Sequence, residues 1–131
     1  MQLTEPSLYN PLALAFVGDA EYGLMVRKML VSASNRHAGD LHRMAVKYEC
    51  APAQAKGAAA IMPLLSEQET AVYKRGRNAH VTHTPKGATV MQYHAATGLE
   101  ALMGYLSLTN NKSRMEELFA AVVAAIDGAE P

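Results

Sequence analysis

The sequence predicts an all-α fold built from a single domain. Half of its 131 residues are apolar, and Ala, Leu and Met predominate over Val, Ile and Thr, which favours helices over strands. Apolar side chains recur around two isolated carboxylates at the three- and four-residue spacing of a helix face. A chain of this length buries a core without disulfides or a structural metal, so we expect one domain over residues 1–131.

The first half of the chain predicts three helices. Asn10 followed by Pro11 is typical of a helix start, and the apolar run that follows continues for about twenty residues. After a polar break, Asp40 lies near the N-cap of the second helix. Pro52 either interrupts that helix or starts the next one. We expect these helices from 11 to about 31, from 40 to about 48 and from 53 to 62.

The second half predicts three more helices around one long loop. Ser66-Glu-Gln-Glu69 is typical of a capping box that opens a helix. Two glycines and a proline between residues 76 and 89 predict an irregular loop. The turn residues Thr109-Asn-Asn111 separate the last two helices. We expect these helices from 67 to about 75, from 90 to about 107 and from 112 to 125.

Two carboxylates, Asp19 and Glu100, stand in otherwise apolar helical segments. Burial of a lone ionised carboxylate costs several kcal/mol unless it is paired or binds a cation. Small residues flank both acids, which leaves room for a hydrated ion or a polymer backbone. We therefore expect them to form one divalent-metal site, and two carboxylate oxygens suit hard Mg²⁺. The alternative is that each acid pairs with a buried Arg or Lys, or caps a helix.

The distribution of charge indicates a cationic surface in the middle of the chain. The sequence holds 12 basic and 12 acidic residues, yet no Asp or Glu lies between Glu69 and Glu100. Cations in this interval suit a polyanion, but they also suit the negative end of a helix dipole. The basic residues and histidines of the interval are Lys74, Arg75, Arg77, His80, His83, Lys86 and His94.

Other polar residues give weaker indications. His80 and His83 have a spacing that can ligate zinc, although a solvated or phosphate-facing pair fits a loop better. Arg36, His37, His42, Arg43 and Lys47 either extend a phosphate track or form a solvated face. The single cysteine, Cys50, suits a reducing compartment, and the N-terminus lacks the features of a secretion signal. We expect a soluble cytoplasmic protein without a membrane segment.

Three motifs resemble the ribonuclease III family, in the right order across the chain. Phe16-Val-Gly-Asp-Ala20 is similar to the signature that carries the metal-binding aspartate of that family. Leu99-Glu-Ala-Leu-Met-Gly104 matches its second signature, with the essential glutamate. Lys74-Arg-Gly-Arg-Asn-Ala79, followed by Thr84-Pro-Lys86, resembles the basic motif of mini-ribonuclease III, the short bacterial branch with the catalytic domain alone. Tyr93 through Thr97 completes the pattern.

The resemblance also has departures. The broader family carries further acids at positions that match Leu12 or Ala15 and Thr97, and all of these are uncharged here. The mini branch is similar in lacking them, which supports the narrower resemblance. Only Asp19 and Glu100 are then carried over as catalytic and metal-binding residues. Because the chain ends at Pro131, we expect no double-stranded-RNA-binding domain after the catalytic one.

The resemblance implies a ribonuclease III endonuclease-like helical bundle and a Mg²⁺-dependent endoribonuclease. Such an enzyme hydrolyses double-stranded RNA to 5′-phosphate products, acts as a homodimer and matures precursor large-subunit (23S) ribosomal RNA. Duplex RNA is recognised mainly by shape and phosphates, which a basic loop can contact. The expected RNA-binding residues are Lys74, Arg75, Arg77, Asn78 and Lys86. The alternatives are a non-catalytic helical RNA-binding homodimer and a helical metal-dependent phosphohydrolase of small nucleotides.

Overall fold

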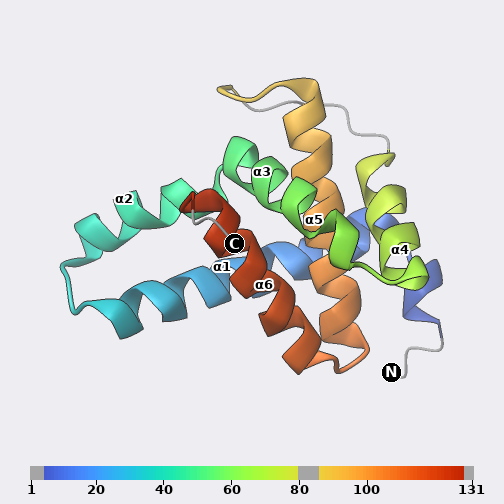
Figure 1. Cartoon of the computed structure of the whole chain (residues 1–131), viewed down its shortest axis with the longest axis horizontal. Coiled ribbons are helices and arrows are strands. Elements are labelled where there is room, and N and C mark those ends of the chain that lie inside the picture. Colours follow the sequence, from blue (N-terminus) through green and yellow to red (C-terminus); the bar gives the residue numbers. More distant parts are fainter. Residues whose placement is uncertain (1–4, 80–85, 129–131) are drawn as a thin grey trace.

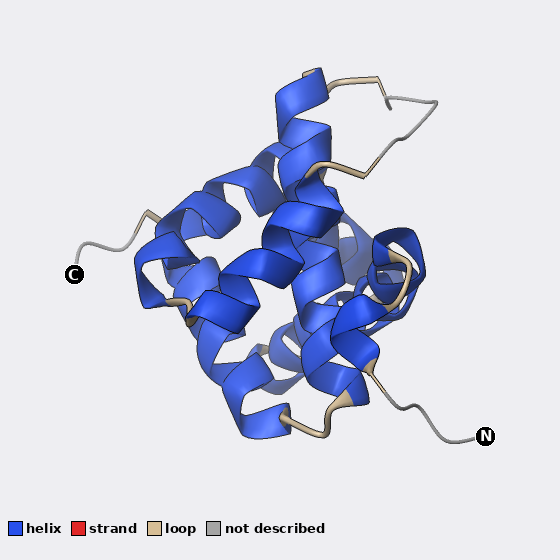
Figure 2. Cartoon of the chain, turned by 90° about the vertical axis from the view of Figure 1, so that its right-hand side faces the viewer, coloured by secondary structure: helices blue, strands red, loops and turns tan. Residues whose placement is uncertain are grey.

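The computed structural model describes residues 5–79 and 86–128, and its regular elements in these ranges are all helical (Figure 2). A short 3₁₀ helix, η1, precedes the first long helix and another, η2, precedes the fourth. The all-α prediction is confirmed. The elements are η1 (Pro6–Leu8), α1 (Pro11–Ala33), α2 (Ala38–Glu49), α3 (Ala51–Ile61), η2 (Met62–Leu64), α4 (Glu67–Arg77), α5 (Val90–Leu108) and α6 (Lys112–Ile126).

The starts of the first three helices follow local chemistry. The Asn10 side chain accepts a hydrogen bond from the backbone N–H of Leu12 at 2.9 Å, as an N-cap should. The second helix begins at Ala38, two residues before the expected start, so Asp40 lies in its first turn, where the helix dipole favours an anion. Pro52 lies in the first turn of α3, and therefore it starts the next helix and does not interrupt the previous one.

Helix α4 extends beyond its expected end. Its predicted capping box is present, because Ser66 and Glu69 exchange side-chain and backbone hydrogen bonds at 2.9 and 3.1 Å. The helix then continues through Gly76 to Arg77. Gly76 is helical because it packs on α5, where a Cβ would come within 2.6 Å of Ala101 Cβ. The basic residues from Lys74 to Arg77 thus belong to a helix end, and the expectation that the loop begins at Gly76 was wrong.

Helix α5 forms the centre of the bundle, with α1, α3 and α4 packed around it (Figure 1). Leu99, Leu102 and Met103 on this helix are fully buried. Helix α2 returns along the C-terminal half of α1 and forms an arm beside the bundle (Figure 1). Among the described residues, no helix combines the length and apolarity needed to cross a bilayer.

Candidate active site

The crossing of α1 and α5 places the two predicted carboxylates beside each other. Gly18 and Gly104 lie at the crossing, and both are buried. A Cβ at Gly18 would overlap the carbonyl oxygen of Glu100, and one at Gly104 would overlap that of Leu14. The two backbones are thus in direct contact. Because Asp19 follows Gly18 directly, this contact brings its side chain to Glu100, as the sequence predicted.

The carboxylate pair is electrostatically unfavourable when both groups are charged. Burial, the largest cause, together with charge repulsion and hydrogen bonding from the adjacent Asp19 carboxylate, raises the pKa of Glu100 to about 8. Asp19 itself is exposed, whereas Glu100 is partly buried. The site therefore favours a proton or a cation between its two acids.

No basic side chain neutralises this pair within residues 5–79 and 86–128. The ion pairs described there involve other acids, namely Asp40, Glu69, Glu117 and Asp127. Neither acid caps a helix, because the caps of α1 and α5 are Asn10 and Thr89. The alternative roles considered for Asp19 and Glu100, an Arg or Lys partner or a helix cap, are thus not found in this part of the chain.

A third acid, Glu49, lies at the end of α2 between two open pockets. One pocket, of about 570 Å³, is lined by Asp19, Gly23 and Arg27 together with Glu49. The other, of about 500 Å³, is lined by Glu49 together with Glu100 and residues of the 86–88 segment. Glu49 thus lines both the pocket that contains Asp19 and the pocket that contains Glu100.

Gln54 on α3 completes the inner wall of the Glu100 pocket. Its side chain is only 3% exposed, and its Nε2 donates to the backbone carbonyl of Glu49 at 3.1 Å. Hydrogen bonding from this amide also lowers the pKa of Glu100, against the larger effect of burial. The amide oxygen, Oε1, is buried without a hydrogen-bond partner.

The donor set fits a hard divalent ion that keeps part of its hydration shell. Asp19 and Glu100 supply carboxylate oxygens, and the unpartnered Oε1 of Gln54 is a further acceptor in the pocket that Glu100 lines. In the described part of the chain, no three His, Cys, Asp or Glu side chains gather closely enough to hold a metal alone. Such an ion would need water or substrate oxygens as its remaining ligands, which is the usual behaviour of Mg²⁺.

The positions where the broader family carries additional acids have other roles here. Thr97 is 6% exposed, and its hydroxyl donates to the carbonyl of Tyr93 at 3.0 Å within α5. Ala15 is buried, and Leu12 is 38% exposed. None of these three side chains adds a charge to the site.

Of the predicted RNA-binding residues, Arg75 has a structural role. Its guanidinium donates to the carbonyl oxygens of Ser7 and, at 3.0 Å, Tyr9, and so fastens η1 to α4. These bonds engage the guanidinium within the fold, and a phosphate contact for Arg75 stays a prediction.

The other predicted RNA-binding residues remain accessible. Lys74, Asn78 and Lys86 are exposed, and Lys86 lines the pocket that contains Glu100. Arg77 lies over the ring of Tyr73, with 5.9 Å from its guanidinium carbon to the ring centroid, and its Nε donates to Asn78 Oδ1. The structure thus brings Lys86 to the acids and leaves Lys74, Arg77 and Asn78 around the end of α4.

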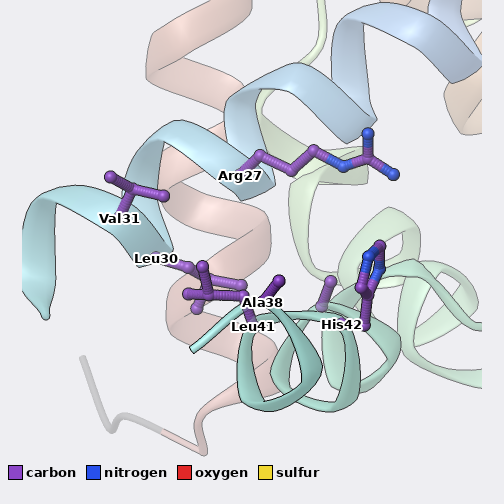
Figure 3. A pocket seen from close by; sticks show the side chains of 7 residues that line it. Arg27, Leu30, Val31, Ala38, Leu41 and His42 are labelled. Carbon is purple, nitrogen blue, oxygen red and sulfur yellow. The ribbon is translucent and has the colours of Figure 1, made fainter. Parts of the chain in front are cut away.

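The histidine and α2 predictions have mixed outcomes. His80 and His83 lie outside the described residues. Arg43 pairs with Asp40, and Lys47 pairs with Asp127 at 2.9 Å, so both take part in ion pairs on the surface. A separate groove of about 190 Å³ lies between α1 and α2, with Arg27 and His42 on one side and Val31 at the opposite end (Figure 3). Neither Asp19 nor Glu100 lines this groove.

Glu49 and Gln54 are two residues of the site that the sequence did not indicate. Glu49 ends a charged amphipathic helix and resembles any solvated acid there. Gln54 carried a usable signal, because it is a long polar residue with alanine on both sides in an Ala-rich helix. A buried amide in such a helix needs hydrogen-bond partners, so it indicates a specific role.

Comparison with known proteins identifies the family. Residues 12–111 match the model of the ribonuclease III domain. The chain is 43% identical to a mini-ribonuclease 3 of a Thermoanaerobacter species over 118 residues, which are 90% of this chain and 83% of that protein. It is 50% identical to the mini-ribonuclease 3 of Enterococcus faecalis over 111 residues, 83% of this chain and 84% of that protein.

The fold also has a close match among solved structures. A crystal structure of a Fusobacterium nucleatum protein superposes with a TM-score of 0.84 at 27% sequence identity, covering 92% of this chain and 97% of that one. The family match spans both signature motifs and the α1–α5 crossing that joins them. The chain therefore belongs to the ribonuclease III family and, within it, to the mini-ribonuclease III branch of endoribonucleases.

Proposed function

We propose that this protein is a Mg²⁺-dependent endonuclease that hydrolyses double-stranded RNA, with Asp19 and Glu100 as its catalytic metal ligands. The observation that carries the proposal is the pairing of these two carboxylates without a cationic partner among the described residues. Two acids in this arrangement are stabilised by a divalent ion, because the ion replaces their repulsion with attraction.

Each side chain contributes a specific part of the chemistry. Bound Mg²⁺ supplies neutralisation of phosphate charge and activation of water for attack on a phosphodiester. Asp19 and Glu100 fix the position of that charge relative to the rigid α1–α5 crossing. Hydrolysis leaves a 5′-phosphate and a 3′-hydroxyl.

Lys86, Lys74, Arg77 and Asn78 are the proposed contacts with RNA phosphates. Lys86 borders the Glu100 pocket, and the other three lie at the C-terminal end of α4. A duplex is recognised mainly through its phosphates and 2′-hydroxyls, so these residues serve without contacts to base edges.

A homodimer is the proposed active assembly. On α1, Leu12 and Phe16 share a helix face with Asp19, and Phe16 is 81% exposed. Exposed apolar side chains that gather on one helix face, as Leu12 and Phe16 do, are typical of an interaction surface. A two-fold pair of domains offers two active sites to the two strands of one duplex.

The proposed substrate is precursor large-subunit (23S) ribosomal RNA, processed in the bacterial cytoplasm. The resemblance to mini-ribonuclease III implies this substrate, the relatives that match are bacterial, and the free thiol of Cys50 suits a reducing compartment.

Incubation of the pure protein with labelled duplex RNA tests the proposal. We expect cleavage of the duplex with Mg²⁺, none with EDTA, and little cleavage of the matched single strand. Asp19→Asn and Glu100→Gln serve as matched controls for contaminating nuclease. Duplex binding without Mg²⁺-dependent cleavage would indicate a non-catalytic RNA-binding dimer, and turnover of mononucleotides would indicate a small-molecule phosphohydrolase.

A further inference from the structure

Gln54 is the buried polar side chain that the fold leaves incompletely satisfied. It is 3% exposed, and its Oε1 has no hydrogen-bond partner in the described structure. A buried carbonyl oxygen without a partner loses its hydration and gains nothing in return, so such atoms are rare in folded proteins. Its place in the wall of the Glu100 pocket leaves this acceptor available to a donor bound in the site.

The orientation of the amide is fixed by its nitrogen. Gln54 Nε2 donates to the Glu49 carbonyl at 3.1 Å, and a flipped amide would place two oxygens against each other there. The same amide lowers the pKa of Glu100, and both residues line the same pocket. The orphaned oxygen is therefore held next to one of the two proposed metal ligands.

The chemistry of the orphaned oxygen selects the kind of ligand. An amide oxygen accepts hydrogen bonds and carries no charge, so it suits the water shell of a hard cation. Side chains that orient metal ligands and accept from coordinated groups commonly alter metal affinity 10- to 100-fold when they are removed.

We propose that Gln54 is a positioning residue of the Mg²⁺ site, whose amide nitrogen holds Glu100 and whose Oε1 accepts a hydrogen bond from the hydration shell of the bound ion. This inference rests on the proposed function, because it takes Asp19 and Glu100 as the metal ligands. It adds an uncharged group from α3 to a site that the two signature motifs build from α1 and α5 alone.

Mg²⁺ binding without RNA is the direct test. The variant is Gln54→Met, which keeps the length of the side chain and removes both polar atoms; Gln68→Met on the exposed face of α4 is the matched control. The measurement is the rise in Tm with Mg²⁺ concentration, with calorimetry as a second readout. We expect Mg²⁺ affinity to fall 10- to 100-fold in Gln54→Met and to stay unchanged in Gln68→Met.

The outcomes separate this inference from the proposed function. A lower Tm for Gln54→Met with unchanged Mg²⁺ affinity would show that Gln54 serves only in packing, and it would overturn the inference. A Tm and a Mg²⁺ affinity that both match the wild type would overturn it as well. If Glu100→Gln also bound Mg²⁺ like the wild type, the proposed function itself would fail.

A second variant keeps the test decisive if Gln54→Met does not fold. Gln54→Asn keeps both polar groups on a side chain that is one methylene shorter, so it withdraws the amide from Glu100 and from the ion, and we expect its Mg²⁺ affinity to fall about tenfold. Wild-type Mg²⁺ affinity in Gln54→Asn would contradict a role for this side chain toward the ion.

Discussion

The folded protein alone does not stabilise the ionised form of the Glu100 carboxyl. It is partly buried on the central helix, and its neighbour Asp19 repels the charge that it carries when ionised. Without a cation, the folded protein therefore retains a proton on this carboxyl well above the ordinary pKa of glutamate. A divalent ion that displaces this proton relieves the same unfavourable interaction.

Asp19→Asn and Glu100→Gln should each lower cleavage of duplex RNA by about 10²–10³-fold or more, because loss of a metal ligand removes several kcal/mol of transition-state stabilisation. Both substitutions keep the shape of the side chain, so circular dichroism and Tm should show an intact fold. Single-turnover cleavage at saturating Mg²⁺ is the measurement. Near-normal turnover in both variants would remove these residues from the mechanism.

The stability of the protein without divalent ions should fall as the pH rises. The pKa of Glu100 is about 8 in the folded state, above its ordinary value of 4.5, so the folded state binds more protons between these two values. The contribution of Glu100 to the unfolding free energy is fully present below pH 4.5 and is lost as the pH rises through about 8.

Urea unfolding at pH 5 and pH 9 measures this loss. For the wild type in EDTA we expect a decrease in unfolding free energy of about 1–3 kcal/mol, allowing for solvent screening at a partly exposed group. For Glu100→Gln we expect a smaller decrease in unfolding free energy, because this variant lacks the titrating carboxyl. An equal decrease in both proteins would assign the pH dependence to other groups.

At the residue scale, the sequence predicted Asp19 and Glu100 and missed Glu49 and Gln54. Asp19 and Glu100 are conspicuous because each is an acid among apolar residues at helical spacing. Gln54 became conspicuous only from its tertiary surroundings, since its burial and its unpaired Oε1 depend on how α3 packs on α5. Arg75 could not be distinguished from its neighbours, because its partners Ser7 and Tyr9 are remote in sequence.

At the scale of elements, the contact between α1 and α5 tolerates no side chain at its glycines. A Cβ at Gly18 would overlap Glu100 and lie 2.8 Å from the backbone nitrogen of Gly104. Gly18→Ala should therefore lower the unfolding free energy by about 3 kcal/mol or more, because the two backbones must separate.

Gly39→Ala is the matched control, measured by the same urea titration. Gly39 lies in α2, and a Cβ there would meet only the Arg43 side chain at 3.8 Å. We expect its stability to stay the same or to rise by about 0.5–1 kcal/mol, the usual gain from alanine in a helix. Equal effects at Gly18 and Gly39 would contradict the close crossing.

The end of α4 should separate into structural and RNA-binding positions. Arg75→Gln removes two hydrogen bonds to the N-terminal segment and should lower the unfolding free energy by about 1–2 kcal/mol. The double variant Lys74→Gln/Arg77→Gln should instead weaken binding to duplex RNA, whatever the sequence of the RNA. It should also reduce the salt dependence by about one unit of slope per lost phosphate contact.

Binding titrations over a range of salt concentrations decide between these roles. The salt slope for Arg75→Gln should stay close to that of the wild type. An unchanged salt slope in the double variant would indicate that Lys74 and Arg77 do not contact phosphates. Their role would then be to complement the negative end of the α4 dipole.

Helix starts were more predictable than helix ends. The starts of α1, α4 and α5 depend on side-chain caps encoded within a few residues, such as Ser66 with Glu69. The end of α4 depends on tertiary packing, because Gly76 remains helical where it meets Ala101 of α5. Gly76 therefore predicted the end of helix α4, but packing against α5 keeps this residue helical.

For the whole molecule, the exposed face of α1 should control assembly. Phe16 is 81% exposed, so Phe16→Ala should leave the monomer fold and its Tm nearly unchanged. If this face forms the dimer, the variant should dissociate at micromolar concentration and lose coupled cleavage of both strands. Light scattering and native gels of the cleavage products measure the two effects.

Two outcomes would contradict this account of assembly. A wild-type monomer that cuts both strands in one encounter would show that pairing of domains is unnecessary. A fully dimeric Phe16→Ala protein would place the interface on another face.

The crossing of α1 and α5 also has a consequence for biosynthesis. The aspartate emerges from the ribosome early, but its partner glutamate follows only after most of the chain has been made, several seconds later at about 5–20 residues per second. Until α5 folds back across α1, the nascent chain holds half of a cation site. Divalent-ion binding at this site therefore has to wait until α5 has been made and has packed against α1.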